Sequence, residues 1–243
     1  MINFKPYSKI FIICLPTLVL ISFIYSFITG EDSLGGAEHD YIVNNIFLMG
    51  FYEDFNLAMK EYGARDEVRN SPLFNIILVQ FLYLGLKISQ IKYLNLIFLI
   101  PIIIYFIKSL KIRYKDISLN SQIIFGSIIL VSPTIRSLVN YPYPFLWAIC
   151  FFIISIFYYL NFQYKKNDKF KNAFYCIFYL SLASYITPNF SVFIIIFLFK
   201  FFLEYSFSKK FLKICLFSLV LSLPALLFLI WKDFYIFKNE VFP

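Results

Sequence analysis

The chain is predicted to be an all-α, polytopic membrane protein with about seven or eight transmembrane helices. Of its 243 residues, 60% are hydrophobic, whereas soluble domains contain about 45–50% apolar residues. Only 15% of the residues are charged. Several apolar stretches approach the roughly 20 residues that a helix needs to cross the hydrocarbon core. We expect one transmembrane domain covering residues 1–243.

The first predicted span covers residues 9–29. Two lysines, Lys5 and Lys9, precede its apolar run. A signal peptide begins in a similar way, but its apolar region is shorter and ends at a small-residue cleavage site. The apolar run here is about 19 residues, which is long enough to cross a bilayer. We therefore expect a retained first helix with a cytoplasmic N-terminus.

Residues 30–71 form a predicted outer loop, far longer than an ordinary connection. The loop holds nine of the fourteen acidic residues and only three basic ones, Lys60, Arg65 and Arg69. It carries a charge of −6 and the rest of the chain +14, an asymmetry that indicates membrane orientation rather than nucleic-acid binding. Two sets of apolar residues at helical spacing predict short interfacial helices: Ile42, Ile46 and Met49, then Phe55, Ala58, Met59 and Tyr62.

Residues 72–231 are predicted to form a helical bundle, followed by a tail at 232–243. The apolar segments of this bundle lie near 72–86, 93–107, 120–138, 143–163, 173–187, 189–203 and 212–231. Cytoplasmic loops are enriched in Lys and Arg, which places three basic clusters in the cytoplasm: Lys108/Lys111/Arg113/Lys115, Lys165/Lys166/Lys169/Lys171 and Lys209/Lys210/Lys213.

Segments 72–86 and 93–107 conflict with this topology. An outer loop before them and a cytoplasmic cluster after them require an odd number of crossings. Yet there are two segments, separated at Lys87-Ile88-Ser89-Gln90. Each is about fifteen residues long, which is short for a span. Either one segment is re-entrant or interfacial, or the charge rule does not apply to the first loop.

Asp40 is the candidate catalytic carboxylate, because it lies in an acidic motif just beyond a membrane exit. Its neighbours Glu38 and His39 would tune its pKa or position a substrate or an ion. The alternative is that Asp40 caps a helix in a solvated loop, a common role for aspartate.

Arg136 is the candidate ligand for a lipid phosphate, since it lies three residues after Pro133 near a predicted helix end. An interfacial arginine is costly and usually pairs, and its guanidinium group matches phosphate geometry. The alternatives are a snorkelling side chain or a pair with a loop acid. Arg69 and Arg65 are weaker candidates for the same role.

Two further expectations concern helix ends. Asn189, next to Pro188, is a candidate substrate-binding residue facing a cavity. Trp147, like Trp231, lies near a predicted helix end and is expected in an interfacial aromatic belt.

Four features share the predicted outer face: Ala37-Glu38-His39-Asp40, Asn70-Ser71-Pro72-Leu73, Ser132-Pro133 with Arg136, and Tyr185-Ile186-Thr187-Pro188. With the topology, they resemble the GT-C superfamily of polyprenyl-phosphate-dependent glycosyltransferases, which includes protein O-mannosyltransferases and lipid A aminoarabinose transferases. The resemblance covers roughly residues 9–200.

The resemblance implies an enzyme of the bacterial inner membrane and cell envelope that transfers a hexosyl or pentosyl group. The donor would be a polyprenyl-phosphate-linked sugar, and the acceptor a protein, lipid or glycan at the outer face. The family supplies a catalytic Asp from the first outer loop, which Asp40 matches, with Glu38 as the fallback. Membrane lipids are the other expected partners. No cofactor or metal motif is found, and a divalent cation at the acidic motif stays open.

Family members are usually much longer and have more spans, so this chain is expected to be truncated or the product of a split gene. The main alternative is a non-catalytic membrane protein: a lipid-linked sugar flippase, a transporter, an assembly partner or an inactive fragment. A transporter should show charges at mid-bilayer depth and an internal repeat, neither of which is clear here. A polymerase or ligase of surface polysaccharide is the second alternative.

Overall fold

The computed structural model describes residues 7–30, 46, 48–64, 72–141, 143–165 and 168–241. All regular structure in these ranges is helical, which confirms the all-α prediction. The helices are α1 (Tyr7–Thr29), α3 (Phe55–Ala64), α4 (Leu73–Tyr83), α5 (Ile88–Arg113), α6 (Leu119–Val131), α7 (Pro133–Asn140), α8 (Pro144–Tyr164), α9 (Lys169–Ile186), the 3-10 helix η1 (Pro188–Val192), α10 (Phe193–Tyr205) and α11 (Lys209–Val241).

Four segments in the described ranges are long and apolar enough to cross a membrane: Ser89–Arg113, Pro144–Tyr164, Pro188–Tyr205 and Lys209–Phe228. A fifth is added if α6 and α7 are counted as one broken span. These helices agree with an integral membrane protein, whereas the expected seven or eight spans are not confirmed. α1 has 23 residues, which gives the helix a length of about 34 Å at a rise of 1.5 Å per residue.

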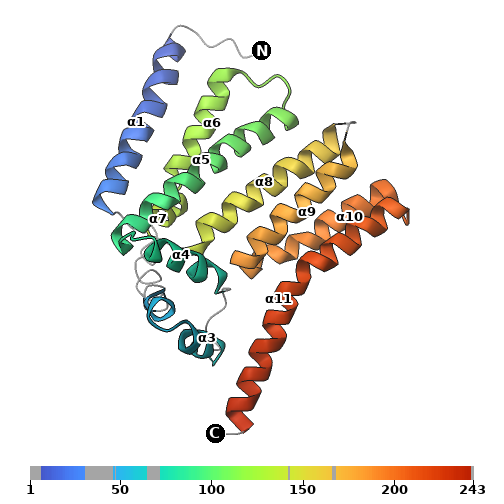
Figure 1. The fold of residues 1–243 in the computed structure, drawn as a ribbon. Coiled ribbons are helices and arrows are strands. Elements are labelled where there is room, and N and C mark those ends of the chain that lie inside the picture. The colour runs from blue at the N-terminus through green and yellow to red at the C-terminus, as the bar shows by residue number, and fades with distance from the viewer. Residues whose placement is uncertain are drawn as a thin grey trace.

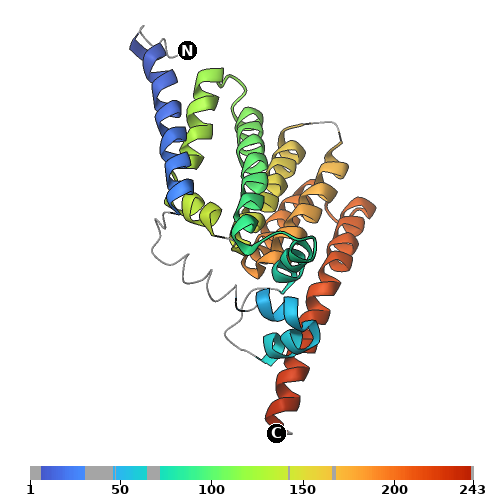
Figure 2. The ribbon, with the colours of Figure 1, turned by 60° about the vertical axis from the view of Figure 1, so that its left-hand side comes forward.

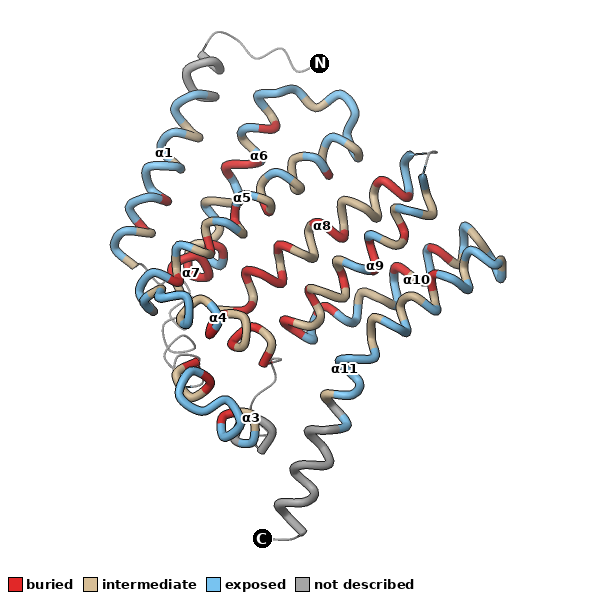
Figure 3. The backbone as a smooth tube through the Cα atoms, in the orientation of Figure 1, coloured by how far each residue is buried: buried red, intermediate tan, exposed pale blue. Residues whose placement is uncertain are grey.

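Helices α5, α8, α9 and α10 lie side by side, with α1 and α6 on one flank and α11 on the other (Figures 1 and 2). The centre of the bundle is the antiparallel pair α8 and α9. Small buried residues of α9, Ala173, Cys176 and Ala183, allow close approach of the two backbones. The Ser155 hydroxyl of α8 donates to the Cys176 carbonyl at 2.8 Å. Figure 3 shows buried residues concentrated in α7, α8 and α9, while the coloured parts of α1 and α11 are largely exposed.

The two ends of the bundle differ in character. One end, here named the basic end, carries the loops after α5, α8 and α10 together with the start of α1 (Figure 1). All three basic clusters flank those loops, as the charge pattern predicts. The opposite end carries Gly30, the short helices α3, α4 and α7, and η1.

The lengths of α4 and α5 remove the crossing conflict. α5 has 26 residues, about 39 Å, whereas α4 has 11, about 16 Å and too short for a hydrocarbon core of about 30 Å. The polar tetrapeptide at 87–90 does not separate two spans; it starts α5. There the Lys87 backbone N–H donates to the Gln90 side chain at 2.9 Å. One crossing therefore joins the opposite end to the basic end.

The apolar segment expected at 120–138 is divided into two helices, because α6 and α7 are bent by 61° relative to each other. Pro133 has no backbone N–H and its ring clashes with the preceding turn, which ends α6. Ser132 then starts α7 by accepting a hydrogen bond from the Ile135 N–H at 3.5 Å. In the acidic loop, α3 forms where the spacing of Phe55, Ala58 and Met59 predicts a helix. α11 continues to Val241, through much of the expected tail.

Candidate functional site

Two of the predicted site residues lie in the part of the chain that the structure describes: Arg136 on α7 and Asn189 in η1. Asn189 is exposed at the turn between α9 and α10, at the opposite end from the basic loops. The others, Asp40, Glu38, His39 and Arg69, lie outside the described residues, so their roles stay predictions.

Arg136 bridges α6, α7 and α1. Its Nε donates to the Leu130 carbonyl at 2.9 Å, and its Nη2 donates to the Ser22 hydroxyl at 2.8 Å. In a continuous helix the Leu130 carbonyl would accept from the N–H four residues later, but the chain bends between them. The half-buried guanidinium thus satisfies a carbonyl near the bend, where an unpaired acceptor in lipid costs several kcal/mol. This structural role was absent from the sequence-based alternatives.

Two further hydrogen bonds extend the contact between α7 and α1. The Asn140 amide donates to the Ser26 carbonyl at 3.2 Å, and the Tyr141 hydroxyl donates to the Gly30 carbonyl at 2.7 Å. We name the set Ser22, Ser26, Gly30, Arg136, Asn140 and Tyr141 the α1–α7 junction. Ser22, Ser26 and Gly30 are spaced four apart and so follow one face of α1.

Gly30 connects this junction to the acidic segment. It follows the last residue of α1 with φ of +70°, the left-handed conformation in which helices commonly end and which glycine adopts at least cost. The Tyr141 hydrogen bond holds its carbonyl. Gly30, the last described residue before the segment carrying Glu38, His39 and Asp40, is therefore held beside α7.

Lys92, in the second turn of α5, is a half-buried cation that sequence reasoning missed. Its Nζ lies 5.0 Å from the ring centroid of Phe27 and 5.7 Å from that of Tyr93. Phe27 is one turn before Gly30, so this cation lies near the exit of the acidic segment. Its place next to the apolar segment 93–107 was a usable signal, because a charge at the edge of a span usually has a partner or a function.

Asn95 was also missed. It is 1% exposed, and its Nδ2 lies 3.2 Å from the carbonyls of Leu138, Val139 and Tyr141. Its Oδ1 accepts from the Trp147 indole N–H at 3.0 Å. The asparagine thereby satisfies carbonyls at the C-terminal end of α7, where a helix has no internal donors.

The aromatic-belt expectation is wrong for Trp147, which is 3% exposed. Its ring stacks on Phe98 at 4.1 Å between centroids and meets Phe74 of α4 edge-on at 5.0 Å. The Asn95 carboxamide supplies the acceptor that a buried indole N–H needs. Trp147 therefore packs α4 against α5 and α8.

Buried polar atoms without a hydrogen-bond partner among the described residues also occur at this end: Ser26 Oγ, Asn75 Oδ1 and Thr187 Oγ1. Such atoms are rare and often mark bound water or a functional site. The described residues contain no group of three or more His, Cys, Asp or Glu side chains able to hold a metal ion. The acidic motif lies outside the described residues.

No family model, curated protein or solved structure matches this chain. The site is therefore defined by its own geometry. Three features lie at one end of the apolar bundle. Gly30 is fixed just before the acidic segment, and Lys92 lies over aromatic rings. Several buried polar atoms there have no hydrogen-bond partner among the described residues.

Proposed function

We propose that the chain is a membrane glycosyltransferase of the GT-C type that moves a hexosyl or pentosyl group from a polyprenyl-phosphate donor to a protein, lipid or glycan acceptor. One observation carries the proposal. Gly30, after which the chain continues toward Asp40, is held beside α7 and follows by one turn the Phe27 ring beneath the Lys92 ammonium. A carboxylate and a cation on one membrane face are the groups that this reaction needs.

Lys92 is the better candidate for the donor phosphate. Among the described residues its ammonium lies over the faces of two aromatic rings, contacts worth about 0.5–2 kcal/mol each, so a phosphate can approach it without displacing a described carboxylate. Arg136 already donates to Leu130 and Ser22. In this proposal Arg136 positions α7 and adds positive charge to the site. Arg69 and Asn189 contact the substrate.

The proposed reaction breaks the bond between the anomeric carbon and the phosphate oxygen. Asp40, or Glu38 in its place, takes the proton from the acceptor hydroxyl or amine as that group attacks the anomeric carbon. The polyprenyl phosphate leaves with the bonding electrons, and Lys92 stabilises its charge. His39 orients the sugar or the acceptor.

The proposed orientation places the basic end and the N-terminus in the cytoplasm of a bacterial inner membrane. The concentration of the basic clusters at one end supports this orientation. The chemistry then takes place at the outer face, where α3 and α4 lie. Exposed apolar residues of α1 and α5, among them Ile24, Ile28 and Ile97, provide surface for the polyprenyl tail.

The test is lipid mass spectrometry on gently purified protein, wild type beside Asp40→Asn, with Glu53→Gln as the matched control. Glu53 is an exposed acid of the same loop. We expect a polyprenyl-phosphate sugar to co-purify and to be enriched in Asp40→Asn alone. Bulk phospholipid in all three folded proteins would reject the transferase.

The alternative is a non-catalytic membrane protein, such as a flippase, transporter or assembly partner. The hydrogen bonds that Arg136 makes within the protein favour it, because they give the arginine a structural role. A lipid-linked sugar bound equally by wild type and Asp40→Asn, without transfer by either, would identify this class.

A further inference from the structure

A second polar site lies at the basic end, away from the α1–α7 junction. A cavity of about 410 Å³ opens between the end of α8 and the start of α9. It is lined by Tyr158, Asn161, Lys165, Asp168, Lys171, Asn172 and Tyr175. Each of these residues bears a polar group, which is unusual within a bundle whose surface is mostly apolar.

Asn161 is a buried polar residue of the cavity lining. The residue is 4% exposed, and its Oδ1 has no hydrogen-bond partner among the described residues. A buried carbonyl oxygen left unpaired costs about 1–3 kcal/mol. Because it is an acceptor, it requires a donor such as a hydroxyl group.

Two lysines and one carboxylate, that of Asp168, line the same cavity and give its lining a net positive charge. Lys165 and Lys171 line it, and α9 begins there with no acidic residue in its first turn. The N-cap residue Asp168 makes no side-chain capping bond to α9. A helix start without a side-chain cap, flanked by two lysines, favours a phosphate group.

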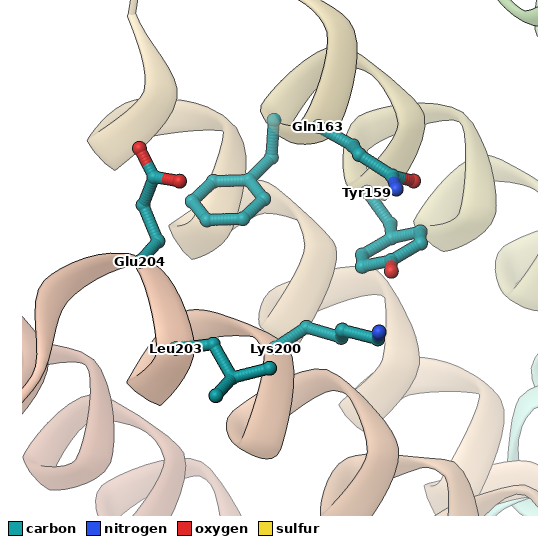
Figure 4. A pocket seen from close by; sticks show the side chains of 6 residues that line it. Tyr159, Gln163, Lys200, Leu203 and Glu204 are labelled. Atoms are coloured by element: carbon teal, nitrogen blue, oxygen red, sulfur yellow. The ribbon is translucent and has the colours of Figure 1, made fainter.

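A neighbouring cavity lacks these features. It measures about 190 Å³ and lies between α8 and α10, lined by Tyr159, Phe162, Gln163, Lys200, Leu203 and Glu204. Its carboxylate, Glu204, already pairs with Lys169. Lys200 extends toward Tyr159 rather than toward Glu204 (Figure 4). This cavity therefore provides the matched control.

We propose that the α8–α9 cavity binds a phosphate ester that also carries hydroxyl groups, with Lys165, Lys171 and the start of α9 on the phosphate and Asn161 Oδ1 on a hydroxyl. The rings of Tyr158 and Tyr175 pack against each other at 4.9 Å between centroids and form part of the cavity wall. Two sources have this chemistry: the headgroup of an anionic phospholipid of the cytoplasmic leaflet, and a soluble polyol phosphate.

The test measures affinities by titration calorimetry on the full chain in a neutral detergent. The probes are dioctanoyl phosphatidylglycerol and dioctanoyl phosphatidylmethanol, which have the same charge but differ in their hydroxyl groups, and glycerol 3-phosphate. We expect phosphatidylglycerol to bind about tenfold more tightly than phosphatidylmethanol. Competition by glycerol 3-phosphate would assign the site to the soluble source, and its failure to compete would assign it to the lipid.

Three variants test the geometry. Asn161→Leu should remove the preference between the two lipids, and Lys171→Gln should weaken both to the same degree. Lys200→Gln, in the neighbouring cavity, should change neither. Two results would overturn the proposal: equal binding of both lipids to the wild type, or equal losses of affinity in Lys171→Gln and Lys200→Gln. Either would mean that the basic end attracts anionic lipids by its overall charge alone. Lys171 is exposed, so its variant tests the site even if Asn161→Leu fails to fold.

Discussion

The indole N–H of Trp147 on α8 donates a 3.0 Å hydrogen bond to the carboxamide oxygen of Asn95 on α5. The nitrogen of the same carboxamide lies 3.2 Å from three carbonyls at the end of α7. Both side chains are almost fully buried. One asparagine thus joins three helices at the end of the bundle that carries the candidate site.

Replacing Asn95 by leucine should destabilise the protein by about 2–3 kcal/mol, because the indole N–H and the α7 carbonyls lose their partner in a buried, apolar setting. The measurement is the free energy of unfolding in mixed detergent micelles. Asn120→Leu, at an exposed position of α6, is the control and should change it little. Equal effects of the two substitutions would contradict the role given to Asn95.

Arg136 and Ser22 should be energetically coupled. A double-mutant cycle with Arg136→Met and Ser22→Ala should give about 0.5–1.5 kcal/mol in unfolding free energy, since each substitution removes the same hydrogen bond. Ser222→Ala serves as the control, because the Ser222 hydroxyl bonds within α11 and should show no coupling to Arg136. A coupling energy of zero between Arg136 and Ser22 would mean that their contact does not stabilise the fold.

Lys92→Gln should weaken binding of a polyprenyl phosphate about tenfold, because it removes the cation assigned to the phosphate. Lys108→Gln is the matched control: Lys108 also lies over a ring, 4.9 Å from the Tyr105 centroid, but near the basic end. Affinity is measured by titration in detergent. An equal loss in both variants would show that position on the bundle is irrelevant.

The topology predicts how single cysteines react with a membrane-impermeant maleimide after the four native cysteines are replaced. Because α4 is too short to cross, Lys87→Cys should be labelled from the same side as Glu53→Cys. Lys115→Cys, beyond α5, should be labelled from the other side. If α4 did cross, Lys87→Cys and Glu53→Cys would react from opposite sides.

Gly126 on α6 lies close to α5. A Cβ at this position would meet Ile107 Cδ1 at 3.0 Å, which is the end of a flexible side chain. Gly126→Ala should therefore be tolerated, whereas Gly126→Leu should cost about 1–3 kcal/mol of stability by overpacking. Thermal unfolding of the two variants side by side measures the difference. A neutral Gly126→Leu would indicate that α5 and α6 separate readily.

Much of the fold class could be predicted from local composition. Apolar runs of span length and clustered lysines are properties of short stretches of chain, so they appear directly in the sequence. The pattern of lysines also predicted that the three basic clusters lie at the same end of the bundle. It did not predict the start of α5, because Lys87 and Gln90 look like a break between two helices in the sequence. Only the hydrogen bond between them shows that they form a helix N-terminus.

The candidate site was only partly predictable. Arg136 was identified by its place near a predicted helix end, but its partners, Ser22 and the Leu130 carbonyl, depend on the bend at Pro133. Trp147 looked interfacial because its place near a helix end is visible in sequence, while the α4 and α5 side chains that bury it are not.

The sequence alone determined that this chain is helical, apolar and divided into acidic and basic regions, since hydrophobicity and charge act through each segment separately. Only the tertiary structure decided that α4 does not cross, that α7 bonds to α1 and that Asn95 joins α5, α7 and α8. The physical reason is that a polar group in an apolar bundle must find its partner nearby in space, and that partner is here often 40 to more than 100 residues away along the chain.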